Sequence, residues 1–107
     1  MYAEAKVYAQ HIVDGLNASQ SHFHAVGECM RQLKAAGFTE IREVDKWNLK
    51  PGKGYYFTRN HSTVVSFVAG LKCGKEKISC YKIIGCHTDS PVMKIAPWSK
   101  LSAVGIN

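Results

Sequence analysis

The residues with the clearest chemical potential are a histidine and an aspartate two positions apart, His87 and Asp89, within the stretch IIGCHTDSP at 83–91. They follow an apolar segment typical of a buried strand, and side chains two positions apart on a strand share a face. His87 can therefore bind a metal ion while Asp89 holds its second ring nitrogen, directly or through a neighbouring group. A histidine beside a strand end is more often a satisfied structural residue, so the spacing alone leaves both interpretations open.

The other histidines add little to such a site. His24 lies close to the predicted start of a helix, where a structural hydrogen bond is the favoured role, and His22 and His61 are expected to face solvent. A hydrolytic zinc site needs about three protein ligands and a water position, and a two-metal site needs bridging carboxylates as well. The chain therefore has too few placed ligands for a complete hydrolytic centre.

Two helices are predicted ahead of this segment. Helical spacing relates the apolar side chains of the first one, Ala5, Tyr8, Ile12 and Leu16. Ser19 and Ser21 can each cap the second helix, which continues through Val26, Met30 and Leu33 in the same spacing until Gly37 ends it.

Strands are predicted after a loop that runs through Lys50–Gly54. Aromatic and β-branched residues at 55–58, 63–69 and 78–85 indicate three of them, with Cys73–Lys75 as the turn before the last. The order of elements predicts an α/β fold, with two amino-terminal helices followed by strands of a mixed sheet and function at the strand ends. No second helical layer follows, so residues 1–107 are interpreted as an incomplete domain.

Composition excludes several classes of protein. The chain is 46% hydrophobic and 21% charged, as in ordinary globular domains, and its apolar stretches are far shorter than the roughly 20 residues that span a bilayer. The first residues lack the basic-then-apolar order of a secretory signal, so the cytoplasm is the expected compartment and no membrane is expected. The four cysteines are accordingly expected to be buried or free thiols.

Charge is distributed unevenly along the chain. Residues 46–107 contain ten basic and two acidic side chains, within a net charge of +6 for the whole chain. Such a half can attract an acidic substrate or nucleic acid, or be balanced by acidic partners elsewhere in a longer protein. Because no nucleic-acid motif and no interleaved stacking aromatics accompany the charges, we expect no nucleic-acid partner.

The segment GCHTDSP at 85–91 resembles the Gly-x-His-Thr-Asp-Ser-Pro signature of the aspartyl aminopeptidase family. Other segments resemble the family in the same order, so the resemblance covers residues 3–100. These segments are SHFHAV at 21–26, AGFTE at 36–40, KW at 46–47, YFTRNHS at 56–62 and KIAPWSK at 94–100. The family commonly has proline where Gln20 and His22 stand.

The resemblance implies a zinc metallo-aminopeptidase that removes amino-terminal aspartate or glutamate from peptides by metal-activated water, and that forms large homo-oligomers. By position, His87 becomes a ligand of one of two zinc ions and Asp89 the residue that orients it. The remaining ligands, the general base and the substrate contacts belong to family segments beyond residue 107. We therefore expect the chain to be the amino-terminal part of a larger zinc-peptidase catalytic domain, inactive alone. The alternative is a truncated, non-catalytic module that binds or regulates full-length subunits.

Overall fold

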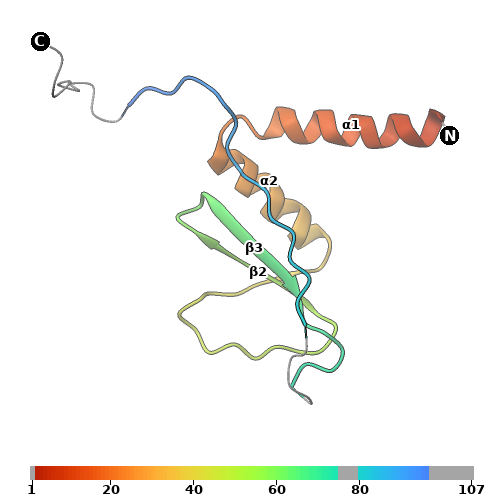
Figure 1. Ribbon diagram of the computed structural model, residues 1–107, viewed down its shortest axis with the longest axis vertical. Helices are drawn as coiled ribbons and strands as arrows, with labels where there is room; N and C mark the ends of the chain where they lie inside the picture. The colour runs from red at the N-terminus through yellow and green to blue at the C-terminus, as the bar shows by residue number, and fades with distance from the viewer. Residues whose placement is uncertain (1, 75–79, 97–107) are drawn as a thin grey trace, which may run out of the picture.

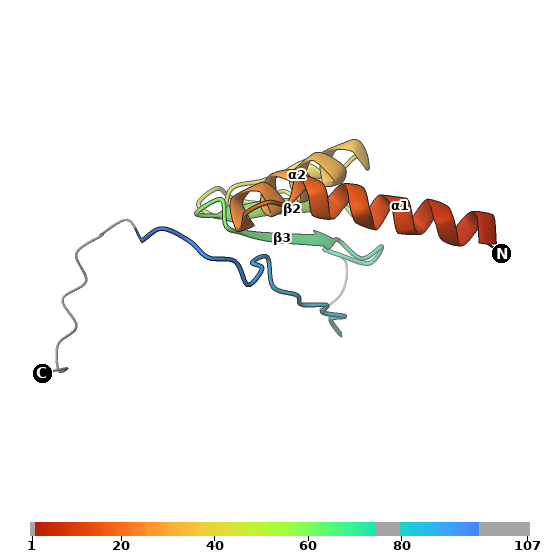
Figure 2. The ribbon, with the colours of Figure 1, turned by 90° about the horizontal axis from the view of Figure 1, so that it is seen from above.

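The computed structural model describes residues 2–74 and 80–96. The elements follow one another as two helices, α1 (Tyr2–Ala18) and α2 (His22–Ala35), and three strands, β1 (Thr39–Glu40), β2 (Gly54–Arg59) and β3 (Thr63–Val68). Helix α2 lies over one face of the sheet, whereas α1 projects away from it (Figures 1 and 2). The predicted α/β class, with helices preceding the strands of a mixed sheet, is confirmed.

Both ends of α2 are set by local sequence. The Ser21 hydroxyl accepts a hydrogen bond from the backbone N–H of His24 at 3.4 Å, which satisfies a donor that the first turn leaves without a helical partner. At the other end Gly37 has φ +82°, a left-handed conformation that glycine adopts without a Cβ penalty. The predicted start and end of this helix are thus confirmed.

The sheet has the order β1-β2-β3. Strand β1 runs parallel to β2, with Thr39 opposite Tyr55, and β3 runs antiparallel to β2, with Arg59 opposite Thr63. The turn between β2 and β3 has positive φ at both Asn60 (50°) and His61 (53°), the signature of a type I′ turn, whose twist matches that of a hairpin.

The core is built around β2. Successive strand side chains point to opposite faces, yet three in a row are buried on this strand, so both of its faces are covered. Tyr55 packs on Phe67, and Trp47 lies over Phe57 and Phe67 with ring centroids 5.7 Å apart in each pair. Tyr56 lies on the opposite face, which α2 covers. The buried apolar residues of the described chain are Val26, Tyr55, Tyr56, Phe57 and Ala69.

The structure corrects two sequence expectations. The loop predicted between the second helix and the first strand contains a strand, β1, at Thr39–Glu40. Two exposed residues are too few to show the alternation that predicts a strand. The third predicted strand, 78–85, is wrong over its described part: residues 80–85 form no strand, and residues 78–79 lie outside the described residues. Ile83 and Ile84 are 87% and 98% exposed, so the segment has strand-like composition without the neighbours that a strand requires.

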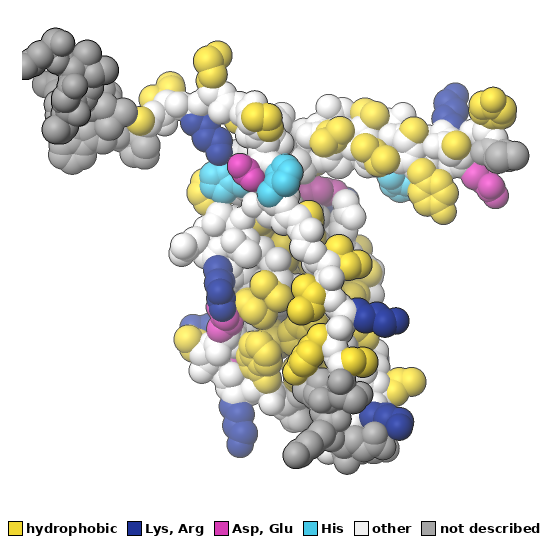
Figure 3. All heavy atoms as spheres, viewed as in Figure 1, with side chains coloured by type: hydrophobic (Ala, Val, Ile, Leu, Met, Phe, Trp, Pro, Cys, Tyr) yellow, Lys and Arg dark blue, Asp and Glu magenta, His cyan; other side chains and the backbone are white. Residues whose placement is uncertain are grey.

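Apolar side chains are also exposed on α1. Tyr8, Ile12 and Leu16 form the predicted stripe, but no residue of α1 is buried. Figure 3 shows apolar side chains along this helix and over the sheet. Other exposed apolar residues include Val68 at the end of β3 and Leu71 after that strand. Within the described ranges, no helix has the length and apolar character needed to cross a membrane.

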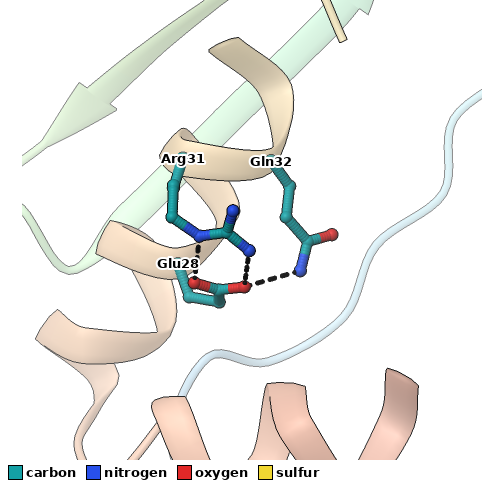
Figure 4. Close-up of polar contacts among 3 residues, drawn as sticks. All are labelled: Glu28, Arg31 and Gln32. Atoms are coloured by element: carbon teal, nitrogen blue, oxygen red, sulfur yellow. Dashed lines mark hydrogen bonds and ion pairs between the residues drawn. The ribbon is translucent and has the colours of Figure 1, made fainter. Parts of the chain in front are cut away.

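A charged cluster on α2 faces the groove between the two helices (Figure 4). The Arg31 guanidinium donates two hydrogen bonds to the Glu28 carboxylate at 2.7 and 2.6 Å, and the Gln32 amide donates a third at 2.9 Å. The bonds from Arg31, then that from Gln32, lower the pKa of Glu28 to about 2, because each favours the charged carboxylate.

Substitution of Gly54 tests the packing that joins β2 to the segment before β1. A Cβ at Gly54 would meet the Phe38 ring at 2.6 Å, far inside van der Waals contact. We expect Gly54→Ala to lower the free energy of unfolding by about 1–3 kcal/mol, as overpacking does. The matched control is Gly27→Ala in α2, where nothing lies within 4 Å of the added methyl group and a gain of about 0.5–1 kcal/mol is expected. Urea unfolding followed by circular dichroism measures both; equal effects would contradict the packing.

The Glu28 cluster predicts a pH dependence of stability. Because the folded pKa of Glu28 is lowered from 4.5 to about 2, its stabilising contribution is present above pH 4.5 and is lost as the pH falls toward 2. The difference in melting temperature between the native chain and Glu28→Gln should therefore be largest at neutral pH and vanish near pH 2. A double-mutant cycle with Arg31→Gln isolates the ion pair. A difference that persists at the lowest pH would refute the assignment.

Candidate functional site

The candidate site lies where an extended segment passes the β2–β3 turn and the start of α2. Residues 80–88 run beside β3 in the opposite direction, and the segment then reaches the junction of the two helices (Figures 1 and 2). In the space-filling view, histidine, acidic and lysine side chains gather at this junction (Figure 3). This region contains the contact of His87 with Asp89 and that of Lys94 with His22.

The ring of His87 is held by the backbone. Its Nδ1 lies 2.8 Å from the main-chain oxygen of Asp89. A carbonyl oxygen can only accept a hydrogen bond, so Nδ1 must carry the proton in this contact. In the neutral ring the proton then sits on Nδ1, and Nε2 keeps its lone pair free. With the side chain 80% exposed, this nitrogen is available to a metal ion.

Asp89 approaches His87 in two ways. Its carboxylate Oδ1 lies 3.5 Å from Nδ1, which is within ion-pair range for a protonated ring but beyond an ordinary hydrogen bond. The shorter contact is the one made by its main-chain oxygen. The sequence analysis expected the Asp89 side chain to hold the ring, directly or through a neighbouring group. In the structure the closer partner is instead the Asp89 main-chain oxygen, and the carboxylate is a second, more distant one.

Thr88, between these two residues, is the member of the site that sequence reasoning missed. Its hydroxyl donates a hydrogen bond of 2.9 Å to the main-chain oxygen of Ser62, 26 residues earlier in the chain. Every other residue at positions 80–96 is exposed, whereas Thr88 is half-buried. The position of this hydroxyl between a histidine and an aspartate could have marked Thr88 as part of the site. Nothing in the sequence, however, indicates that its acceptor is Ser62.

The remaining polar groups near the site make structural contacts. The Ser21 hydroxyl lies 2.8 Å from Nδ1 of His24, in keeping with the structural role expected for that histidine. His22 is not simply solvent-facing, because its Nδ1 accepts a hydrogen bond from the Lys94 ammonium group at 3.2 Å.

The cysteines are free, as expected, but none is fully buried. Cys29 and Cys73 are partly buried, and Cys80 and Cys86 are exposed. Burial, with a smaller contribution from Cys86, raises the pKa of the Cys29 thiol. The raised pKa keeps Cys29 in its neutral, unreactive thiol form.

The donor set fits a metal ion in part. The free Nε2 of His87 is a suitable zinc ligand, and the hydrogen bond at Nδ1 is the kind that fixes the tautomer of such a ligand. Across residues 2–74 and 80–96, however, no three histidine, cysteine or acidic side chains come together as a metal-binding group. The described residues therefore offer one candidate ligand, His87, and no complete metal site.

Comparison with known proteins identifies the family. Residues 16–107 match the family described as Aminopeptidase I zinc metalloprotease (M18). The chain belongs to this family. It is 43% identical over 94 residues to a probable aspartyl aminopeptidase of Ricinus communis, covering 88% of this chain and 19% of the relative. It is 45% identical over 92 residues to an aspartyl aminopeptidase of Aspergillus oryzae, covering 84% of this chain and 18% of the relative. The predicted resemblance is confirmed.

A solved structure shares the fold over two thirds of this chain. The match is to a chain in a cryo-EM structure of the Ape4 and Nbr1 complex, with a TM-score of 0.64 and 35% identity. It covers 67% of this chain and 14% of that chain. The present chain thus spans about a fifth of the length of the curated aminopeptidases that it matches.

The hydrogen bond at Nδ1 predicts the tautomer of His87. Above neutral pH, nitrogen-15 NMR should show the proton of the His87 ring on Nδ1. Asp89→Asn should leave this tautomer unchanged, because the acceptor is the main-chain oxygen rather than the carboxylate. His11, on exposed α1, serves as an internal reference in the same spectra. A proton on Nε2 of His87, or a change of tautomer in Asp89→Asn, would contradict the geometry.

Proposed function

We propose that residues 1–107 are the amino-terminal part of the catalytic domain of a metallo-aminopeptidase, and that His87 is a ligand of its metal centre. The observation that supports this most directly is the free Nε2 of His87, held by a hydrogen bond at Nδ1, in a segment that matches the M18 family. Asp89 orients the ring through its main-chain oxygen, and its carboxylate adds negative charge 3.5 Å from Nδ1. That charge favours the imidazole as a ligand.

The proposed metal is zinc, with two ions in the complete enzyme, and it supplies an activated water and a polarised carbonyl. The chain contributes a neutral imidazole at one coordination position. The family description as a zinc metalloprotease supports the choice of metal.

The proposed substrates are peptides with an acidic amino terminus. This follows the names of relatives that are 43% and 45% identical to the chain and are called aspartyl aminopeptidases. The excess of basic side chains at 46–107 is consistent with an acidic substrate. We also propose that the complete enzyme is a homo-oligomer and that it is located in the cytoplasm.

The chain by itself should not hydrolyse peptides. One imidazole cannot supply the roughly three ligands that a hydrolytic zinc site needs, nor a general base. We expect the purified chain, with zinc added, to release no aspartate from peptides that begin with aspartate or glutamate, as measured by mass spectrometry. Release that disappears with a chelator would overturn the expectation.

The same assay addresses the alternative, a non-catalytic module that binds full-length M18 subunits. In the described part of the chain the outer edge of β3 has no strand paired to it, and unpaired edges invite pairing. Added to an active M18 aminopeptidase, the chain should leave its rate unchanged if it is only a part of a catalytic domain. Inhibition together with co-purification would favour the regulatory module instead.

A further inference from the structure

The segment that contains His87 has few hydrogen bonds to the rest of the described fold. Among residues 80–96 only Thr88 is withdrawn from solvent, and two side-chain hydrogen bonds join the part around His87 to distant described residues. One is the hydrogen bond from Thr88 to Ser62. The other joins Lys94, which is seven residues beyond His87, to His22. The bond from His87 to Asp89 is local and orients the ring without placing the segment.

The acceptor of the Thr88 bond belongs to the β2–β3 turn, which is held by several hydrogen bonds. Ser62 closes the β2–β3 turn, where its N–H donates to the Arg59 oxygen at 3.1 Å. Positive φ at both central residues fixes the direction of the turn. Arg59 is held in addition by two hydrogen bonds to the Glu43 carboxylate at 2.8 and 2.6 Å. These bonds therefore fix the position of the Ser62 main-chain oxygen that accepts from Thr88.

We propose that Thr88 is a positioning residue for His87, and that its hydroxyl tethers the segment to the β2–β3 turn. Because adjacent Cα atoms are about 3.8 Å apart, fixing Thr88 confines the Cα of His87 to that distance from a defined point. The bond to Asp89 then sets the ring. Two hydrogen bonds from neighbouring residues thus define both the place and the tautomer of the imidazole. The proposal rests on the proposed metal role of His87 and adds a second support for it.

The test is nitrogen-15 relaxation of the full 107-residue chain by NMR. In the native chain the backbone order parameters at 87–89 should approach the value of about 0.85 that is typical of rigid backbone. Thr88→Val keeps the shape of the side chain but removes the donor, and the values should fall below about 0.6, as in flexible segments. Thr88→Ser keeps the hydroxyl and should restore rigidity.

The matched control is Ser90→Ala, which removes an exposed hydroxyl from the same segment and should change nothing. Circular dichroism of each variant checks that the helices persist. If Thr88→Val alters the helices, the order parameters of Thr88→Ala and Thr88→Ser are compared instead, because these two variants also differ in the hydroxyl. A flexible segment in the native chain, or a rigid one in the variants that lack the hydroxyl, would overturn the tether.

Zinc titration of the same samples separates this proposal from the proposed function. The ring signals of His87 in the native chain should shift as zinc is added. A ring that ignores zinc while the segment is rigid would overturn the metal role and leave Thr88 as a structural contact only. A ring that responds to zinc in a segment that Thr88→Val leaves rigid would overturn the positioning role alone.

Discussion

Burial of three successive aromatic residues on β2 is the constraint on which the rest of the structure depends. Tyr55 and Phe57 point to one face of the sheet and Tyr56 to the other, so each face needs its own cover. Helix α2 covers the face of Tyr56, and Trp47 and Phe67 cover the opposite face. The hydroxyl of Tyr56 reaches the Glu40 carboxylate at 3.4 Å, which links the buried strand to β1.

This arrangement connects the core to the candidate site by way of a turn. Strand β2 leads directly into the β2–β3 turn, which has left-handed residues at Asn60 and His61 and ends at Ser62. Thr88 binds that oxygen, and His87 lies next to it. The proposed position of His87 therefore depends on the packing of β2 through one backbone carbonyl, that of Ser62.

Elements whose signals are local were predictable. Helix α2 has a serine cap, helical apolar spacing and a left-handed glycine, all encoded within a few residues of each other, and it begins and ends close to where they indicate. Strands β2 and β3 combine β-branched and aromatic residues on either side of a tight turn. Strand β1 and the lack of a strand at 80–85 were not predictable, because both depend on whether a distant segment supplies backbone hydrogen bonds.

The sequence by itself determined the family and the chemistry available at the candidate site. That chemistry is an imidazole and a carboxylate two positions apart, within the part of the chain that matches the M18 family. It left open how Asp89 meets His87, and it did not reveal Thr88. Only the tertiary structure decided that the main-chain oxygen of Asp89 is the closer partner and that Thr88 reaches Ser62. Residue spacing limits which side chains share a face, whereas backbone acceptors and contacts between residues 26 positions apart arise only when the chain has folded.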